Sequence, residues 1–516
     1  MKKWLIAAVF AASMQAQTVR PPEELLRLVS MREDMSPWAQ RSPEELKAWL
    51  AKGVRFDCGD QRLAAKFYTS KLVLLANMFQ DGIFDRPYLI EGGVYKGFWF
   101  ESVPATVQVF ARIDLDTSKA QMMQFIKHQM PDGYLPYKVI MSGPGERSIG
   151  FGWIALAAWH LYMLDGDRAF LEAMYAPLGR WIEWMGKYRD ANRNGIYEAW
   201  SPGDMGQDNS ARFPGVPLHV DNLRVAPVGR PTPYDAPDAS GLMHIEMLSL
   251  GEIADVLGKP AEARQWRKRA AELRARVNAS LWDPATACYY DRDSKGEYVK
   301  MVSVAMLRAL FCGLPTPEMA RQMFEKHILN PHEFWTPCPL PSFALNEPKS
   351  TPSAPDVWSG PTMCLTNLRA PYAFEHYGRG RELRDVYRRY LPHVARQAAT
   401  FQQYHPVTGD GGASRSVRLY SPAAAGYIDG IARLYGIVPR GRHLEWNATL
   451  PPGGPGSAFE MDLGGTTYRL SCEAGRCSGY AGAKRIFRVA AGTIVYTDRA
   501  GARVAASAVR DFPRFN

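Results

Sequence analysis

Two carboxylates stand in a short polar segment that also carries an amide, a hydroxyl and an arginine. The segment, residues 200–213, reads Trp-Ser-Pro-Gly-Asp-Met-Gly-Gln-Asp-Asn-Ser-Ala-Arg-Phe, and its carboxylates are Asp204 and Asp208. Burial among aromatic residues such as Trp200 and Phe213 raises the pKa of a carboxyl group, which lets the group stay protonated and act as an acid. An aspartate before Asn-Ser can instead cap a turn. The residues alone leave both interpretations open.

Other motifs that carry chemistry are weak or missing in this chain. The sequence has no Gly-rich phosphate loop, no Gly-x-Ser-x-Gly and no His-Glu-x-x-His. Residues 190–195, Asp-Ala-Asn-Arg-Asn-Gly, resemble the start of a calcium loop, but Ser201 stands where an EF-hand needs an acidic residue, which favours a turn. Glu198 could still complete a smaller calcium site. Three histidines inside helical runs lack partners at metal spacing and are predicted to be core residues: His160, His244 and His376. We therefore expect carboxylate chemistry with no metal and no cofactor.

The polar segment lies between helical patterns of two alternating kinds. Residues 151–164 are apolar on nearly all sides, which predicts a helix that is buried all round. After a turn at 165–167, apolar residues recur in steps of four, four and three from Phe170 to Trp181, as on the inner face of a surface helix. A buried helix is therefore predicted to pair with an outer one.

This pairing repeats from about residue 60 to about residue 437. Residues 242–257 form an apolar pattern, and Gly258-Lys-Pro260 separates it from the amphipathic stretch 266–281. Further pairs are predicted at 62–80 with 98–113, 300–313 with 315–328, and 360–377 with 379–399, with 420–437 as a closing inner helix. The expected fold is mainly α, an (α/α)6 toroid whose inner helix ends and loops line a central funnel. An α-solenoid that only binds is the alternative, but the chain lacks the fixed repeat of such arrays.

The two ends of the chain differ from the helical part. Residues 438–516 alternate short β-type runs with Gly and Pro clusters, which predicts a small antiparallel β domain. Residues 1–17 combine Lys2 and Lys3 with a short apolar run, as in a secretory signal peptide. The domain prediction is therefore a signal peptide (1–17), an N-terminal segment (18–59), the toroid (60–437) and the β domain (438–516).

The signal peptide, the net charge and the cysteine content limit the possible partners and the cellular compartment. The signal peptide predicts a periplasmic or secreted protein with no membrane span after cleavage, although an uncleaved anchor is the alternative. The net charge of +10 is spread over helical segments, which argues against a nucleic-acid partner. Seven cysteines are an odd number, so at least one is free or pairs between molecules. A disulfide between Cys472 and Cys477 is expected, because four residues including a glycine can form a hairpin between them.

The motifs between residues 60 and 437 resemble the inverting glycosidases of glycoside hydrolase family sixty-three and its trehalase-like and mannosylglycerate-hydrolase-like relatives. In the acid-bearing loop of that family an aspartate is followed by Asn-Ser and then by Arg-Phe or Arg-Trp, as at 208–213 here. Other motifs follow in the family's order: 190–198, Leu281-Trp-Asp283 with Tyr289-Tyr-Asp291, Glu333-Phe-Trp-Thr-Pro337, Trp358-Ser-Gly-Pro361 with Asn367, and Tyr404-His-Pro-Val-Thr-Gly409. The resemblance implies that Asp208 is a general acid and that the partner is a carbohydrate substrate.

The resemblance also implies which residues hold the sugar. Aromatic faces and planar hydrogen-bonding groups hold carbohydrates in pockets. The substrate-binding candidates are Tyr95, Trp99, Glu101, Asp204, Asn209, Arg212, Trp358, Gly360, Asn367 and Tyr404. Of the aromatic candidates, Trp358 is the strongest, because the small residues beside it would leave its ring exposed.

Position 402 departs from the family pattern. The family's general base is a glutamate four residues before the proline of the Tyr-x-Pro-x-Thr-Gly segment, and that position here is Gln402. A carboxamide cannot accept a proton from water. Another carboxylate could take over, with Asp410 and Asp356 as candidates; the alignment of this loop could be displaced; or the protein could bind glycans without hydrolysing them.

These observations predict an exported glycoside hydrolase that acts on a small α-linked glucoside or mannoside by inversion. A non-hydrolytic glycan-binding protein is the first alternative, and Gln402 favours it. A polysaccharide lyase is the second, with Tyr404, His405 and Asn367 as the residues that could abstract a proton or neutralise a uronate.

Overall fold

The computed structural model describes residues 19–80, 84, 86–140, 143–145, 148–412, 417–452, 454, 456–509 and 513. The predicted signal peptide lies outside these residues. The chain divides into two compact units. One combines Ile431–Val509 with the described residues up to Leu72, and the other is Val73–Gly430. No helix in the described part of the chain is long and apolar enough to cross a membrane.

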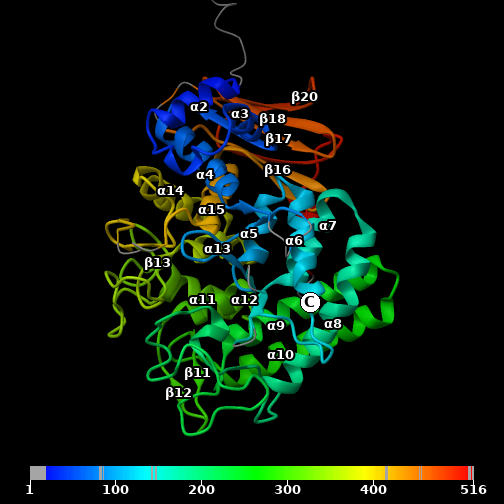
Figure 1. The fold of residues 1–516 in the computed structure, drawn as a ribbon, viewed down its shortest axis with the longest axis vertical. Coiled ribbons are helices and arrows are strands. Elements are labelled where there is room, and N and C mark those ends of the chain that lie inside the picture. Colours follow the sequence, from blue (N-terminus) through cyan, green and yellow to red (C-terminus); the bar gives the residue numbers. More distant parts are fainter. Residues whose placement is uncertain are drawn as a thin grey trace, which may run out of the picture. The chain divides into compact units, whose positions relative to one another are not determined.

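The first unit combines short N-terminal helices with antiparallel strands (Figure 1). Its elements are α2 (Pro22–Ser30), η1 (Ser36–Trp38), α3 (Pro43–Ala51), β1 (Val54–Cys58), β15 (Ile437–Arg440), β16 (His443–Ala448), β17 (Gly456–Leu463), β18 (Thr466–Glu473), β19 (Arg476–Ala481), β20 (Lys484–Ala490), β21 (Thr493–Asp498) and η4 (Ala506–Ala508). Two helices span the boundary between the units: α4 (Gln61–Ala76) and α15 (Ser421–Tyr435). The β-type runs predicted after residue 438 thus occur as strands.

The strands of this unit form two antiparallel sheets, one in the order β1-β17-β18-β19-β20 and one in the order β15-β16-β21. Strand β1 pairs with β17 in the register Val54 opposite Met461, a pairing that no pattern in the sequence predicts. The ring of Phe67 in α4 lies 5.7 Å from Phe56 and 6.3 Å from Phe459, so this pairing also closes an aromatic core.

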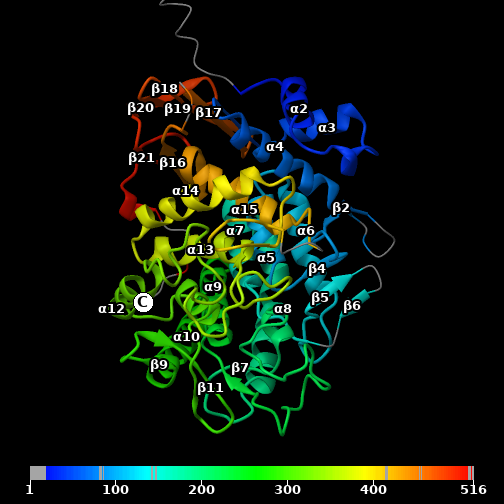
Figure 2. The ribbon, with the colours of Figure 1, turned by 90° about the vertical axis from the view of Figure 1, so that its left-hand side faces the viewer.

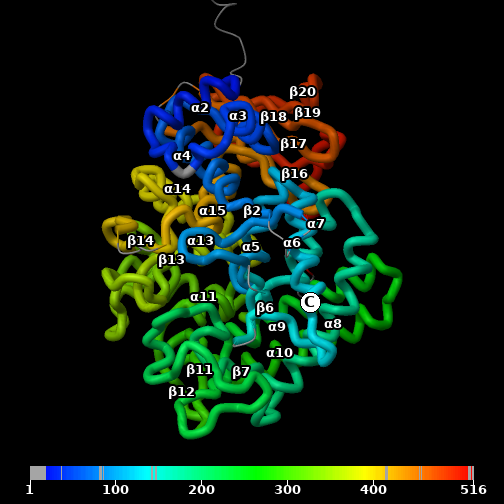
Figure 3. Tube along the Cα trace, in the orientation of Figure 1, coloured from blue at the N-terminus to red at the C-terminus, as the bar shows by residue number. Residues whose placement is uncertain are grey.

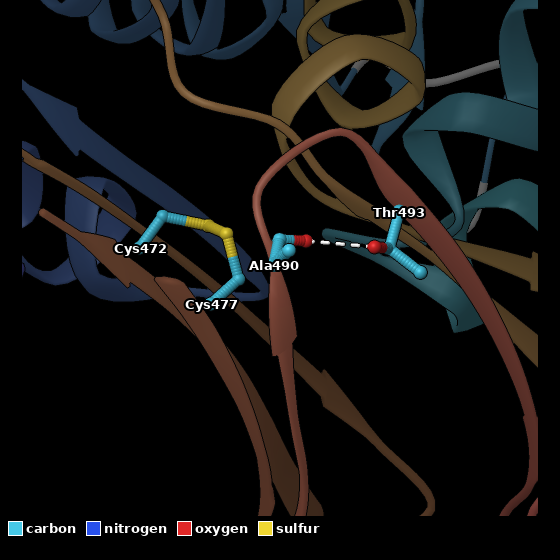
Figure 4. The surroundings of a disulfide bond; sticks show 4 residues. All are labelled: Cys472, Cys477, Ala490 and Thr493. Atoms are coloured by element: carbon cyan, nitrogen blue, oxygen red, sulfur yellow. Dashed lines mark hydrogen bonds between the residues drawn. A yellow bond between two sulfur atoms is a disulfide. The ribbon is translucent and has the colours of Figure 1, made fainter. Parts of the chain in front are cut away.

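The predicted disulfide between Cys472 and Cys477 is confirmed (Figure 4). These cysteines face each other across the β18–β19 hairpin. Near them, the Thr493 hydroxyl donates a hydrogen bond of 2.7 Å to the Ala490 carbonyl. The remaining cysteines are all free and buried, in agreement with a structural role: Cys58, Cys288, Cys312, Cys338 and Cys364.

The second unit is rich in helices, with short strands in the connections between them (Figure 2). Its helices are α5 (Val103–Phe110), α6 (Leu115–Lys127), α7 (Ile154–Asp165), α8 (Arg168–Tyr188), η2 (Pro202–Met205), α9 (Pro237–Val256), α10 (Pro260–Ser280), α11 (Val304–Phe311), α12 (Pro317–Met323), the π-helix η3 (Phe324–Ile328), α13 (Cys364–His376) and α14 (Gly380–Arg396). Its strands are β2 (Met78–Phe79), β3 (Tyr88–Leu89), β4 (Gly97–Trp99), β5 (Lys138–Ile140), β6 (Gly143–Gly145), β7 (Glu198–Ala199), β8 (Tyr234–Asp235), β9 (Trp282–Asp283), β10 (Cys288–Tyr289), β11 (Asp291–Arg292), β12 (Tyr298–Val299), β13 (Thr362–Met363) and β14 (Gln403–Tyr404).

Three of the predicted helix pairs are present and packed together: α7 with α8, α9 with α10, and α13 with α14. Gly166 ends α7 in a left-handed conformation, and the Asp167 side chain caps α8 by accepting a hydrogen bond from the Phe170 amide. The predicted helix at 98–113 is corrected at its start, because residues 97–99 form strand β4 and the helix begins at 103. Helix α6 was not predicted.

Buried polar groups join α9 to α7 and to the residue that follows α11. The Glu246 carboxylate in α9 accepts hydrogen bonds from the Ala155 and Leu156 amides in the first turn of α7. His244 bonds through Nδ1 to the Cys312 carbonyl at 2.9 Å, and burial lowers its pKa to about 3. The prediction that His244 is a hydrogen-bonded core residue is therefore confirmed.

The calcium-like loop is held by its own amides. The Asn192 and Asn194 side chains donate hydrogen bonds of 3.0 and 2.6 Å to the two oxygens of Asp235. Asp190 accepts a hydrogen bond from the Gly195 amide at 3.1 Å. These contacts agree with the turn interpretation.

Candidate active site

A cavity of about 160 Å³ in the second unit brings together many of the residues singled out in the sequence. Its lining is Glu91, Tyr95, Trp99, Glu101, Tyr137, Lys138, Gly203, Gly206, Asp208, Leu218, His219, Trp358, Leu365, Gln402 and Tyr420. Six of these were candidates from the sequence: Tyr95, Trp99, Glu101, Asp208, Trp358 and Gln402. The prediction that the Trp358 ring is exposed is wrong, because the residue is only 3% exposed.

Asp208 is carried by the long connection between α8 and α9, which follows an irregular path (Figure 3). The backbone carbonyl of Asp208 accepts a hydrogen bond from the Trp358 amide at 3.2 Å. The next residue, Asn209, has a positive φ of 55° and donates from its side chain to the Asp356 carbonyl at 3.0 Å. The Ser210 hydroxyl donates to the Trp358 carbonyl at 3.1 Å. These hydrogen bonds connect the loop that carries the candidate acid, residues 200–213 (the acid loop), to the loop around Trp358.

The Asp208 carboxyl group has the environment that a general acid needs. Burial raises its pKa above the ordinary aspartate value, and the positive charge of Lys138 partly offsets this rise. Its side chain still keeps a partly exposed surface toward the cavity. A carboxyl group of this kind can hold a proton and present it to a ligand.

Arg212 lies behind this loop and outside the cavity lining. Its guanidinium is fully buried between two carboxylates, with Nη1 2.7 Å from Asp238 and Nη2 2.6 Å from Asp291. The other guanidinium contacts, Nη2 to Asp238 and Nε to Asp291, are 2.8 and 2.7 Å, so that both carboxylates are held at two points. Burial alone lowers the pKa of Arg212, but the two carboxylates outweigh it and raise the pKa. Arg212 thereby ties the end of the acid loop to the start of α9 and to β11.

Asp204 also lies outside the cavity lining. Its carboxylate accepts hydrogen bonds from the Trp200 amide at 3.1 Å and from the Ile149 amide at 3.4 Å, and it lies 3.8 Å from Arg189. These contacts hold the start of the acid loop. Its assignment as a substrate-binding residue stays a prediction.

The other candidates from the sequence do not line the cavity. Asp410 is exposed and accepts a hydrogen bond from the Gly412 amide at 2.9 Å. Asp356 is half-buried and does not line the cavity; burial raises the pKa of Tyr95, and the Asp356 charge adds to this rise. Gly360, Asn367 and Tyr404 are buried and bonded to backbone or side-chain groups of neighbouring loops. Asn367 and Tyr404 were two of the three residues named for the lyase alternative. Neither lines the cavity, which counts against that alternative.

Gln402 lines the cavity immediately before strand β14. Its carbonyl accepts a hydrogen bond from the Cys364 amide at 2.9 Å, and its amide donates to the Val417 carbonyl at 3.3 Å. Its side chain is hydrogen-bonded to Tyr95. The residue is only 8% exposed, so a neutral amide stands in the wall where the family pattern has a carboxylate.

Two glutamates complete the carboxylate set of the cavity. Burial raises the pKa of Glu91 to about 7, although a hydrogen bond from Tyr420 lowers it. Burial raises the pKa of Glu101 to about 8, and the negative charges of Glu91 and Asp208 add to this rise. The three carboxyl groups therefore oppose one another's ionisation.

Glu91 was missed in the sequence analysis, although it left a signal. It precedes Gly92 and Gly93, which have φ values of 95° and 62°. A Cβ on Gly92 would lie 2.3 Å from the Leu419 carbonyl oxygen, so the backbone here passes close to the segment before α15. Two consecutive glycines permit such a close backbone approach. Their position beside an acidic residue could therefore have marked Glu91 as a candidate site residue.

Aromatic residues and two basic residues form much of the rest of the cavity. The rings of Tyr95 and Trp99 meet edge to face with centroids 5.2 Å apart. The Lys138 ammonium lies 5.4 Å from the Trp99 ring centroid and 5.2 Å from that of Tyr137. The ring nitrogen Nδ1 of His219 lies 2.6 Å from the Ser148 hydroxyl. Stacking surfaces, carboxyl groups and a cation together suit a polyhydroxylated ligand.

Comparison with known proteins agrees with this arrangement. Residues 104–419 match the family model of the mannosylglycerate hydrolase MGH1-like glycoside hydrolase domain. An uncharacterized protein of Borreliella burgdorferi is 19% identical over 249 residues, which are 48% of this chain and 48% of that protein. The chain thus spans about half the length of this relative.

Two further comparisons involve proteins named for an activity. A mannosylglycerate hydrolase of Rubrobacter radiotolerans is 21% identical over 319 residues, 51% of this chain and 68% of that protein. The crystal structure of a GH63 mannosylglycerate hydrolase from Thermus thermophilus, in complex with Tris, has a TM-score of 0.59 at 20% identity and covers 70% of this chain and 98% of that one. Because the family model spans well over half of the chain, the protein belongs to the mannosylglycerate hydrolase MGH1-like glycoside hydrolase family.

Proposed function

We propose that this protein hydrolyses a small α-linked glucoside or mannoside with inversion, and that Asp208 is the general acid. The observation that carries the proposal is Asp208 itself, a carboxyl group of raised pKa that lines an aromatic cavity together with two further carboxyl groups. Inversion needs one acid and one base across the sugar ring, and a cavity with several carboxyl groups can supply both.

In this reaction Asp208 gives its proton to the glycosidic oxygen as the bond to the anomeric carbon breaks. A water molecule attacks the opposite face of that carbon and loses its proton to a base. Tyr95, Trp99 and Trp358 hold the sugar, since these aromatic residues line the cavity. Relatives named mannosylglycerate hydrolase support a mannoside as substrate. A carboxylate in the leaving group would find Lys138 in the same cavity.

The proposed architecture is the (α/α)6 toroid with a β domain after residue 438. Packing of α7 on α8, α9 on α10 and α13 on α14 supports alternating inner and outer helices. Burial supports the same assignment, because α9 is buried on nearly all sides whereas α10 buries only one face. Export through the predicted signal peptide belongs to the same proposal, and the Cys472–Cys477 disulfide suits an oxidising compartment.

The test is a screen of aryl α-glucosides, aryl α-mannosides and mannosylglycerate with wild type and Asp208→Asn. We expect wild type to release a β-configured sugar, seen by proton NMR within the first minutes, and Asp208→Asn to be slower by about 100- to 10,000-fold. Wild type that hydrolyses none of these substrates, or an Asp208→Asn variant as active as wild type, would refute the proposal.

A glycan-binding protein without turnover is the second candidate, and the amide of Gln402 in the cavity wall favours it. Isothermal titration with the products and substrates of the screen separates the two. Binding without any product release would assign the cavity to recognition alone.

A further inference from the structure

Position 402 cannot supply the base, and the carboxylates suggested by the sequence lie outside the cavity. Asp410 is exposed on its loop, and Asp356 does not line the cavity. Glu91 and Glu101 are the carboxylates that share the lining with Asp208. The choice of base is therefore between these two.

Glu101 packs against the loop that carries the acid, and the Glu91 charge also reaches it. Gly206 stands two residues before Asp208, and a Cβ built on it would lie 2.5 Å from Cγ of Glu101. The Glu101 side chain thus packs directly against the loop that carries the acid. An inverting enzyme needs its base on the opposite face of the sugar. This position makes Glu101 a poor base and a good ligand for a sugar hydroxyl.

Glu91 lies on the side of Gln402. The Tyr420 hydroxyl donates a hydrogen bond of 2.6 Å to Glu91 Oε1, and the Tyr420 ring lies 6.2 Å from that of Tyr95. Tyr95 is in turn hydrogen-bonded to the Gln402 side chain. Burial raises the pKa of Cys364, and the Glu91 charge adds to this rise; the Cys364 amide donates to the Gln402 carbonyl. Glu91 and Gln402 are therefore connected through Tyr420 and Tyr95, and both line the cavity.

The backbone holds Glu91 in place. Its amide donates to the Gly97 carbonyl at 2.7 Å, and its carbonyl accepts from the Ser421 amide at 2.8 Å. The residue is only 5% exposed, and the Tyr420 hydrogen bond fixes one carboxylate oxygen. A general base needs this kind of fixed orientation toward the water that it activates.

We infer that Glu91 is the general base of this cavity and replaces the family's glutamate, whose position Gln402 occupies. This inference rests on the proposed hydrolysis. Glu91 takes a proton from water while the water oxygen bonds to the anomeric carbon. The glycosidic bond breaks in the same step, and its oxygen takes the proton of Asp208. The products are a sugar of inverted configuration and an alcohol, with Glu91 protonated and Asp208 ionised. Proton exchange with solvent restores both groups.

The experiment compares Glu91→Ala, Glu91→Gln and Asp208→Ala on two substrates, an aryl α-glycoside that wild type cleaves and the matching α-glycosyl fluoride. Fluoride leaves with little protonation, so Asp208→Ala should keep most of its activity on the fluoride. The Glu91 variants should lose about 100- to 10,000-fold in kcat on both substrates, because each still needs an activated water. Glu172→Ala, which removes an exposed carboxylate on α8, is the matched control.

Rescue by azide distinguishes a general base from a residue with a purely structural role at position 91. In Glu91→Ala, azide fits the space of the lost side chain and needs no base, so it should restore turnover and yield the β-glycosyl azide. Glu91→Gln keeps the shape of the side chain, and its fluoride kinetics decide the matter if Glu91→Ala does not fold. The inference is overturned if the Glu91 variants stay within about tenfold of wild type, or if folded Glu91→Ala yields no azide product. Wild type without hydrolysis would instead refute the proposed function.

Discussion

Replacement of Arg212 by methionine should destabilise the second unit strongly. The guanidinium lies between Asp238 and Asp291, at 2.7 and 2.6 Å, and its side chain is 1% exposed. Methionine fills similar space but leaves two buried carboxylates facing each other without their shared cation. Removal of one partner of a buried ion pair costs about 3–5 kcal/mol. Arg308, 3.8 Å from Asp238, compensates only part of this loss. We therefore expect a loss of about 3–5 kcal/mol in the free energy of unfolding.

The assay is equilibrium urea unfolding followed by tryptophan fluorescence. The triple variant Arg212→Met, Asp238→Asn, Asp291→Asn is the decisive control. It removes the charges together, and such replacements are far less harmful than the removal of one partner. We expect it to recover at least half of the loss.

The pH dependence gives an independent check. Without Arg212 the buried carboxylates hold protons more tightly in the folded state than in the unfolded state, so the variant gains stability relative to wild type as the pH falls. The deficit of Arg212→Met should therefore shrink between about pH 8 and about pH 5. A loss below about 1 kcal/mol, or a deficit that grows at low pH, would show that Arg212 does not act as a buried counterion.

Three further predictions concern the cavity. Lys138→Met removes the charge that lowers the pKa of Asp208, so the alkaline limb of the profile of kcat/KM against pH should move to higher pH. Gly92→Ala forces a side chain into a backbone with φ of 95° and into a 2.3 Å contact, so its melting temperature should fall and activity should fall with it. In the Glu91→Ala background, Gln402→Glu returns a carboxylate to the same wall and should raise kcat at least tenfold. If the double variant shows no gain in kcat over Glu91→Ala, this result would count against the inference that residues 91 and 402 lie on one wall of the cavity.

The helical pattern was predictable because it is local. The apolar surface of residues 242–257 and the glycine and proline near 258–260 define α9, its end and the start of α10 without reference to the rest of the chain. The pairing of β1 with β17 was not predictable in this way. It joins residues from distant parts of the chain, and no short-range period records such a contact.

The candidate site could likewise be predicted only in part. Asp208, Trp358 and Gln402 were named through a family pattern, and all three line one cavity. Arg212 was named through the same pattern, yet its guanidinium serves the loop from behind. A motif records which residues occur together, whereas their orientation depends on partners such as Asp291, which lies in a distant segment.

The identity of residue 402 makes physical sense once Glu91 is counted. Glu91, Glu101 and Asp208 already share one small cavity, and burial together with their mutual repulsion raises the pKa of Glu91 to about 7 and that of Glu101 to about 8. A fourth carboxylate at 402 would lie beside Tyr95 in the cavity that Glu91 also lines. It would raise the pKa of Glu91 further, because like charges disfavour ionisation. A larger fraction of Glu91 would then be protonated at neutral pH, and only the ionised fraction can accept a proton from water. An amide at 402 keeps the hydrogen bond to Tyr95 and adds no charge. On this argument, Gln402 permits the ionised state of Glu91 on which the proposed hydrolysis depends.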